Sequence, residues 1–201
     1  CIQMRDYRQA IEYLTLCMKT IEKLQLNSLR VCNISKLYGI LALCSVLTGN
    51  RFNCERYLLS CKQFLNYVLE KEDTDEIGSI HDYAKCDDDM FLYYFAQALL
   101  DVMEEKETEA AKDYEIAERH LRQAEGNQFF CYRLFRESRI QFYQSVGRLE
   151  LRDNERELLK QYEETEKRLD LEESLKVLEH VGLSQDEGTE ISMHKINDLI
   201  S

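Results

Sequence analysis

The amino-acid sequence predicts an all-α protein in which antiparallel helix hairpins stack in a row. The first observation is composition: the 201 residues contain no proline and seven glycines, so residues that break helices are scarce. The second is periodicity, because apolar residues recur three and four positions apart through most of the chain. The third is spacing, since short polar or glycine-containing turns separate the periodic segments. Pairs of such helices form αα-hairpins, and a row of hairpins stacks into a solenoid.

The first three predicted helices are delimited by residues that favour turns or helix caps. Residues 2–26 carry an apolar stripe of helical period. Residues 33–48 are apolar nearly all round, which indicates burial on more than one side, and Gly49 follows their end as expected for a helix terminus. Asn53 can cap a third helix, which is predicted to extend to about residue 69.

Four further helices follow an acidic, polar loop at about residues 71–89. Asp87, Asp88 and Asp89 supply negative charge and a cap at the start of the helix predicted at residues 90–103. The remaining helices are predicted at residues 108–124, 129–151 and 155–181, with the break between the last two at Asp153 and Asn154.

The predicted organisation has three parts. Residues 1–150 form the helical repeats and include the acidic loop. Residues 151–182 form a highly charged helix that caps the solenoid end, because its heptad pattern is too broken for a long coiled coil. Residues 183–201 contain a linker and a short amphipathic tail helix, which could dock on the same molecule or self-associate with a neighbouring one.

Charge, hydropathy and cysteine usage restrict the partners and the compartment. The formal net charge is −12, with 38 acidic and 26 basic residues, whereas a nucleic-acid binder needs a net basic surface. The sequence contains no run of about 18 apolar residues, so no membrane-spanning helix is predicted. The eight cysteines form no CxxC pair, and they indicate buried free thiols in a reducing, intracellular compartment, cytoplasmic or nuclear.

Patterns that carry catalysis or bind cofactors are not found in the sequence. The seven glycines form no phosphate-binding loop and no nucleophile elbow. His81 and Cys86, with the aspartates at 87–89, could ligate a metal, but their spacing matches no structural site and favours a polar loop with a helix cap. Other carboxylates lie on charged helix faces beside lysine or arginine. We therefore predict that the protein is not an enzyme and holds no metal or cofactor.

Small and bulky residues recur in three stretches at the spacing of a known repeat. They are Tyr7, Ala10, Leu14 and Cys17 in RDYRQAIEYLTLC, then Ala110, Tyr114 and Ala117, and Tyr38, Leu41 and Ala42 ahead of Gly49-Asn50. The pattern resembles degenerate tetratricopeptide (TPR) repeats, in which small residues allow close helix approach and bulky ones fill the gap to the next hairpin. The proline that ends the family's repeats is missing. A looser scaffold, such as the solenoid that precedes a PCI domain, fits the same pattern.

The resemblance implies a right-handed α-solenoid that works by binding other proteins. It also implies that the stretch from Tyr7 to Cys17 is the second helix of a repeat whose first helix lies upstream and covers it. The family's first helices line a concave groove that holds a helix or an extended segment of a partner. The residues of this groove would be Gly39, Leu43, Val46, Phe95, Leu99 and Val102, unless they pack against further helices of the same solenoid.

A stripe of arginines forms a second candidate surface in a chain of net negative charge. It could dock an acidic or phosphorylated partner segment. The alternative is that the arginines pair with glutamates of neighbouring helices, such as Glu115 and Glu118. The stripe consists of Arg119, Arg122, Arg133, Arg136 and Arg139.

The function predicted from these features is binding. The chain is expected to be a protein-interaction scaffold or adaptor, within a larger intracellular complex, that binds a partner segment in an apolar groove. A regulatory or sensor helical-repeat domain attached to an enzyme is an alternative. A nucleic-acid-binding helical repeat is a weaker alternative, because of the net negative charge.

Overall fold

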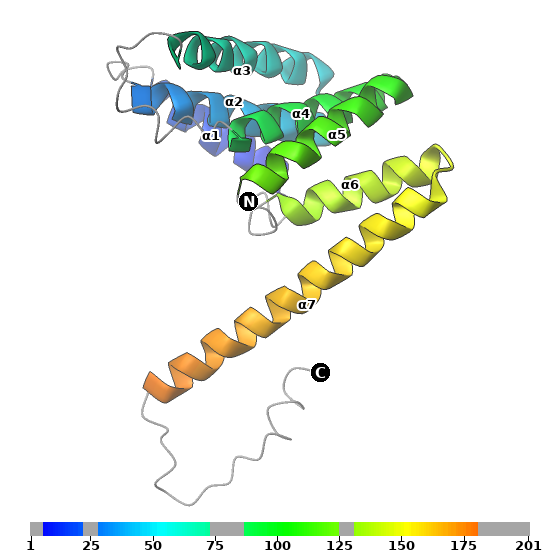
Figure 1. Ribbon diagram of the computed structural model, residues 1–201. Coiled ribbons are helices and arrows are strands. Elements are labelled where there is room, and N and C mark those ends of the chain that lie inside the picture. Colours follow the sequence, from blue (N-terminus) through cyan, green and yellow to red (C-terminus); the bar gives the residue numbers. More distant parts are fainter. Residues whose placement is uncertain (1–5, 22–27, 73–86, 125–130, 181–201) are drawn as a thin grey trace, which may run out of the picture. The chain divides into compact units, whose positions relative to one another are not determined.

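The computed structural model describes residues 6–21, 28–72, 87–124 and 131–180, and Figure 1 labels its helices. Within these residues the chain is all-α and contains no strand, which confirms the predicted fold class. The predicted tail helix lies outside the described residues. The helices are α1 (Tyr7–Ile21), α2 (Ser28–Leu47), α3 (Arg51–Glu72), α4 (Asp87–Met103), α5 (Glu107–Gln123), α6 (Tyr132–Ser145) and α7 (Leu149–His180).

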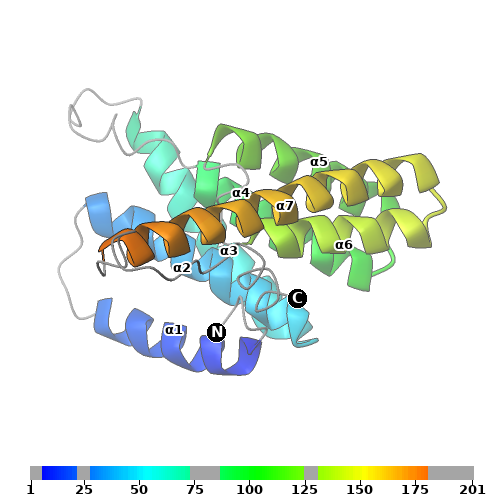
Figure 2. The same ribbon diagram turned by 90° about the horizontal axis from the view of Figure 1, so that it is seen from below.

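Neighbouring helices pack in a repeat-like arrangement. Helix α2 packs against α1, α3 and α4, and α4 packs against α5 and α6. Figure 2 shows α1 running beside α2 on the side away from α5. The chain divides into two compact units, Cys1–Leu159 and Lys160–Ser201, so the α7 helix begins in the first unit and ends in the second. None of the described helices is long and apolar enough to cross a membrane.

Three tight turns between helices share one backbone geometry. Gly49, Glu105 and Gly147 each have positive φ, at 75°, 59° and 73°. In each turn the next N–H bonds to the carbonyl five residues earlier, which satisfies an orphan carbonyl at the end of the preceding helix. These bonds are Asn50 N to Ser45 O at 2.8 Å, Lys106 N to Asp101 O at 2.9 Å and Arg148 N to Tyr143 O at 2.8 Å.

Two predicted turn or cap positions are wrong, and α2 begins at Ser28 and not near residue 33. The break between the last two helices lies at Gly147 and not at Asp153 and Asn154, which are inside α7. Glycine adopts the left-handed conformation of this turn without the steric cost that a side chain carries. The cap of α3 is Asn50 and not Asn53, because the Asn50 Oδ1 accepts the Asn53 backbone N–H at 3.1 Å. In both cases the chain turns a few residues earlier than the predicted signal.

The first turn of α4 is acidic, as predicted, and each of its three aspartates has a specific partner. The Asp87 carboxylate lies 2.8 Å from His120 Nδ1. Asp88 and Asp89 both bind α2: Asp88 pairs with Lys36 at 2.8 Å, and Asp89 accepts a hydrogen bond from the Ser35 hydroxyl. The helix dipole favours negative charge at this end of α4. The contacts of the three aspartates join α4 to α2 and α5.

The core at α4, α5 and α6 is aromatic. Phe95 and Phe135 meet edge to face with ring centroids 5.1 Å apart, and Tyr114 contacts Phe142 at 5.3 Å. Ala110 and Ala117, the small residues on either side of Tyr114, are fully buried. Small side chains at these positions let α4 and α5 approach closely, as the predicted spacing of small and bulky residues requires.

The structure describes the side chains of five cysteines, and these five are free thiols. Cys44, Cys54, Cys61 and Cys131 are buried, as predicted, and burial raises the pKa of Cys44, Cys54 and Cys61 to about 12. These thiols therefore act as small apolar groups rather than as nucleophiles. Cys17 of α1 is exposed.

Candidate binding cleft

The predicted groove residues on α2 and α4 lie largely in the core. Leu43, Val46 and Phe95 are buried among other helices, Leu99 is half-buried, and Val102 is exposed over 38% of its surface. Gly39 is buried where α2 meets α4. A Cβ at Gly39 would lie 2.9 Å from Leu92 Cβ, so glycine permits the close approach of the two helices. In this arrangement only Leu99 and Val102 present surface to a partner, and the partner-binding role of the six residues stays a prediction.

The predicted arginine stripe is divided between the surface and the interior. Arg119, Arg122 and Arg133 are exposed, and Arg133 pairs along its own helix with Glu137 at 3.3 Å. Arg136 and Arg139 are buried. The stripe is therefore not one continuous positive surface, because its last two side chains point into the protein.

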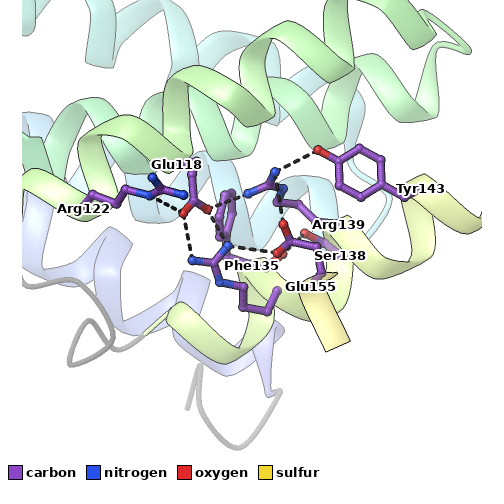
Figure 3. A network of polar contacts seen from close by, with 8 residues as sticks. Glu118, Arg122, Phe135, Ser138, Arg139, Tyr143 and Glu155 are labelled. Atoms are coloured by element: carbon purple, nitrogen blue, oxygen red, sulfur yellow. Dashed lines mark hydrogen bonds and ion pairs between the residues drawn. The ribbon is translucent and has the colours of Figure 1, made fainter. Parts of the chain in front are cut away.

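Arg136 and Arg139 hold a buried charge network that joins α5, α6 and the start of α7 (Figure 3). Arg136 donates two hydrogen bonds to Glu118, from Nη1 to Oε2 at 2.5 Å and from Nη2 to Oε1 at 3.0 Å. Its Nη1 also reaches Glu155 Oε2 at 2.9 Å. Arg139 bonds Glu118 at 2.5 Å and lies 3.2 Å from Glu155. The predicted pairing with Glu118 is confirmed, and Glu155 of α7 is an additional partner.

The charges of this network stabilise one another. Burial alone would raise the pKa of Glu118, but hydrogen bonds from Arg136 and the charge of Arg139 hold that pKa below its ordinary value. Burial would likewise lower the pKa of Arg136, and its bonds to Glu118 with the charge of Glu155 raise it instead. Glu118 and Glu155 neutralise the two buried arginines, and the exposed Arg122 also donates to Glu118 at 2.9 Å, so the network binds the helices together.

The described residues also form an open cleft between α1, α2 and α3, with a volume of about 340 Å³. Helix α2 contributes Tyr38 and Leu41 to it. The Tyr38 ring stacks on Phe64 at 5.7 Å, and it lies 6.1 Å from the ring of Tyr57. Tyr38, Leu41 and Tyr57 make an apolar floor together with Met18 of α1, and the aromatic contacts keep its shape.

The rim of the cleft is polar and carries positive charge. Helix α1 contributes Thr15 and Lys19, and α3 contributes Arg56 and Ser60. The Thr15 hydroxyl donates to a carbonyl of its own helix at 2.7 Å. The Arg56 guanidinium lies over the Tyr57 ring, 4.9 Å from its centroid. An apolar floor with a few placed polar groups is the usual composition of a site that binds a side chain or a small ligand.

Sequence reasoning found the helices of this cleft but not the cleft itself. Tyr38 and Leu41 were identified as packing positions within a repeat, and the partner groove was assigned to the other side of their helix. The signal available in the sequence was positive charge: Lys19 and Arg56 are cations on the two helices that flank α2. Their meeting at one rim depends on how α1 and α3 pack on α2, which no local pattern reveals.

Other ionisable groups serve the packing of helices. Burial raises the pKa of Asp89 to about 6, and burial together with a hydrogen bond from the protonated Asp113 carboxyl to Asp101 raises the pKa of Asp113 to about 6. Among the residues that the structure describes, no three histidine, cysteine, aspartate or glutamate side chains lie together as metal ligands would. His81 and Cys86, the other members of the predicted metal alternative, lie outside the described residues.

Comparison with known proteins leaves the chain without an assigned family. No family model matches the sequence, and neither the curated proteins nor the solved structures contain a significant match. The function proposed for the chain therefore rests on its own sequence and on the geometry of the α1–α3 cleft.

Proposed function

We propose that this chain is a protein-interaction scaffold, a right-handed TPR-like solenoid in a larger intracellular assembly, and that it binds a partner segment in the α1–α3 cleft. In this proposal one apolar side chain of the partner enters the cleft and contacts Tyr38, Leu41 and Met18. The partner backbone then lies along α1 and α3, where the polar rim determines its orientation. The proposed function of the chain is binding, and not catalysis.

The observation that carries the proposal is the unfilled apolar floor between three packed helices. Leu41 and Met18 are buried, yet the cleft above them has room for about 340 Å³. This volume is within the range of binding sites, which extends from about 300 to 1,000 Å³. Interface energy concentrates where an aromatic or aliphatic side chain fills such a pocket and a polar rim excludes water.

Filling the cleft with a larger side chain of the protein itself tests the proposal. Ser60 lines the cleft and is half-buried, so Ser60→Trp should occupy its space without removing any core contact. We expect the purified variant to remain helical by circular dichroism. In affinity purification from cells, followed by mass spectrometry, it should lose at least one protein that the unaltered chain retains.

Asn66→Trp is the matched control, because it adds the same side chain to an exposed position of α3 that does not line the cleft. Proteins bound through the cleft should be retained by Asn66→Trp and lost by Ser60→Trp. If both variants retain the same set of proteins as the unaltered chain, the α1–α3 cleft is not the binding site.

A further inference from the structure

The charge around the cleft is positive, although the chain as a whole is acidic. Helices α1 and α3 together contain six basic and four acidic side chains, whereas the whole chain has a formal net charge of −12. The two helices flank the cleft, so their cations contribute to one local field. Such a field attracts an acidic segment and repels a basic one.

The two cations on the rim are not neutralised within the described residues. Neither Lys19 nor Arg56 has a carboxylate partner there, whereas Lys36 and Lys106 pair with aspartate or glutamate. In an acidic protein with many carboxylates, two rim cations that meet no carboxylate among the described residues are a specific feature. They leave the positive charge of the rim available to a ligand.

The Arg56 side chain is held in place for such a role. Its guanidinium stacks over the Tyr57 ring, and its Nη2 donates to the Tyr57 hydroxyl at 3.2 Å. A guanidinium has five N–H donors in a planar fork, so this contact leaves donors for a carboxylate. An arginine oriented by stacking loses less side-chain entropy when it binds.

The hydroxyl groups of the rim do not provide an alternative donor. The Thr15 hydroxyl donates to Ile11 O at 2.7 Å, and the Ser60 hydroxyl donates to Arg56 O at 3.2 Å. Each hydroxyl has one proton, so both act towards a ligand as acceptors. Lys19 and Arg56 are therefore the rim side chains that select an acidic partner.

We propose that the segment bound in the α1–α3 cleft is an acidic peptide, in which an aliphatic or aromatic side chain is accompanied by aspartate or glutamate. The apolar side chain enters the cleft, and the carboxylates pair with Lys19 and Arg56. This inference rests on the proposed function, because it names the chemistry of the partner segment for the same cleft.

Selection from two peptide-display libraries tests the inference. Both libraries carry leucine, isoleucine or phenylalanine at the same fixed positions. In one the variable positions draw on aspartate, glutamate, serine and alanine, and in the other lysine and arginine replace the acids. The libraries are mixed and selected on the immobilised 201-residue chain. We expect the enriched peptides to come from the acidic library, and a synthetic copy to bind more weakly as salt is added.

Reversing the charges of Lys19 and Arg56 tests whether these two side chains contact the peptide. Lys19→Glu with Arg56→Glu should weaken binding of the enriched acidic peptide by about tenfold or more, because two attractive pairs become repulsive. The same double variant should gain affinity for a peptide whose acids are replaced by lysine. Arg8→Glu with Lys62→Glu is the control: it changes the net charge equally on the same helices, at exposed residues outside the cleft. This control should retain most of the affinity.

The outcomes separate the inference from the proposed function. If peptides of both libraries are enriched equally and Ser60→Trp abolishes their binding, the cleft binds apolar segments and the acidic preference is wrong. If no enriched peptide responds to Ser60→Trp, the proposed function fails and the inference fails with it. Equal losses in both charge-reversal variants would exclude Lys19 and Arg56 as specific contacts. If an oligouridylate competes with the peptide at low salt, Lys19 and Arg56 bind nucleic acid, and the peptide proposal is overturned.

Discussion

At the scale of single residues, Asp89 shows how one buried carboxyl links stability to pH. Asp89 lies in the first turn of α4, is buried against α2 and accepts a hydrogen bond from Ser35. Burial raises its pKa from 3.8 to about 6, although Ser35 and the charge of Lys36 lower it. A raised pKa means that the folded protein binds this proton more tightly than the unfolded chain. The contribution of Asp89 to the free energy of unfolding is therefore fully present below its pKa in the unfolded chain. It is lost as the pH rises through the folded-state pKa of about 6.

Asp89→Asn should consequently stabilise the protein at neutral pH. The amide retains an acceptor for Ser35 and removes the buried charge, so we expect a gain of about 2 kcal/mol in the free energy of unfolding near pH 8. The gain should shrink towards zero near about pH 4, where Asp89 is protonated in the folded protein. Urea unfolding of both proteins at the two pH values measures the difference.

Asp88→Asn is the control for this prediction. The Asp88 carboxylate pairs with Lys36 at 2.8 Å and is more exposed than that of Asp89. Its replacement removes an attractive pair and should not stabilise the protein at any pH. An equal gain in both aspartate variants would show that burial of Asp89 is not the cause.

At the scale of the secondary-structure element, one glycine decides where α6 ends and α7 begins. Gly147 has φ 73°, and a Cβ placed on it would meet nothing within 4 Å. The constraint is therefore conformational and not steric contact with a neighbour. The positive φ lets Arg148 N bond Tyr143 O at 2.8 Å, which closes the end of α6 and lets the chain reverse.

Gly147→Ala should destabilise the protein by about 1 kcal/mol, because an alanine in the left-handed region is strained. Gly147→Asn should cost clearly less, since asparagine adopts this conformation more readily than other residues with a side chain. Thermal or denaturant unfolding of the two variants provides the comparison. Equal costs for alanine and asparagine would indicate that the turn does not depend on the left-handed backbone.

At the scale of the first compact unit, the buried network around Glu118 connects three successive helices. Glu118 belongs to α5, Arg136 and Arg139 to α6, and Glu155 to the start of α7. Arg139 also donates to the Tyr143 hydroxyl at 2.8 Å. Removing one member of a buried ion network leaves the others charged without a partner, which costs more than the lost bond.

Glu118→Gln should therefore reduce the free energy of unfolding by about 3 kcal/mol, because two buried arginines lose their shared counter-charge. The pKa of Glu118 in the folded protein is held below its ordinary value. The contribution of Glu118 to stability is therefore present above its pKa in the unfolded chain, and it is lost as the pH falls through its pKa in the folded protein. The difference in free energy of unfolding between the unaltered protein and Glu118→Gln should accordingly decrease at acidic pH. Glu115→Gln, at an exposed position of the same helix, should change stability little. A cost for Glu118→Gln no larger than this control would contradict the role of the network.

The sequence alone predicted much of the fold. Absent proline, helical periodicity and turn residues predicted an all-α chain, and the small and bulky positions at Ala110, Tyr114 and Ala117 are buried as expected. These are local signals: a helix and its buried stripe follow from the spacing of residues along the chain. The same local logic misplaced the end of α6, because Gly147 lies within an otherwise continuous helical pattern.

The location of the candidate site depended on the tertiary structure. Periodicity shows that a helix face is apolar, but not which neighbouring helix covers it. Leu43 and Phe95 were expected on a groove and are core residues, whereas the open cleft lies where α1 and α3 flank Tyr38 and Leu41. Arg136 and Arg139 turned inward because Glu118 and Glu155 meet them there.

The sequence by itself determined the helices and their apolar stripes. Only the packing of those helices decided which side chains are buried and which positive charges remain at a rim, because contacts between distant residues are set by three-dimensional proximity and not by spacing along the chain.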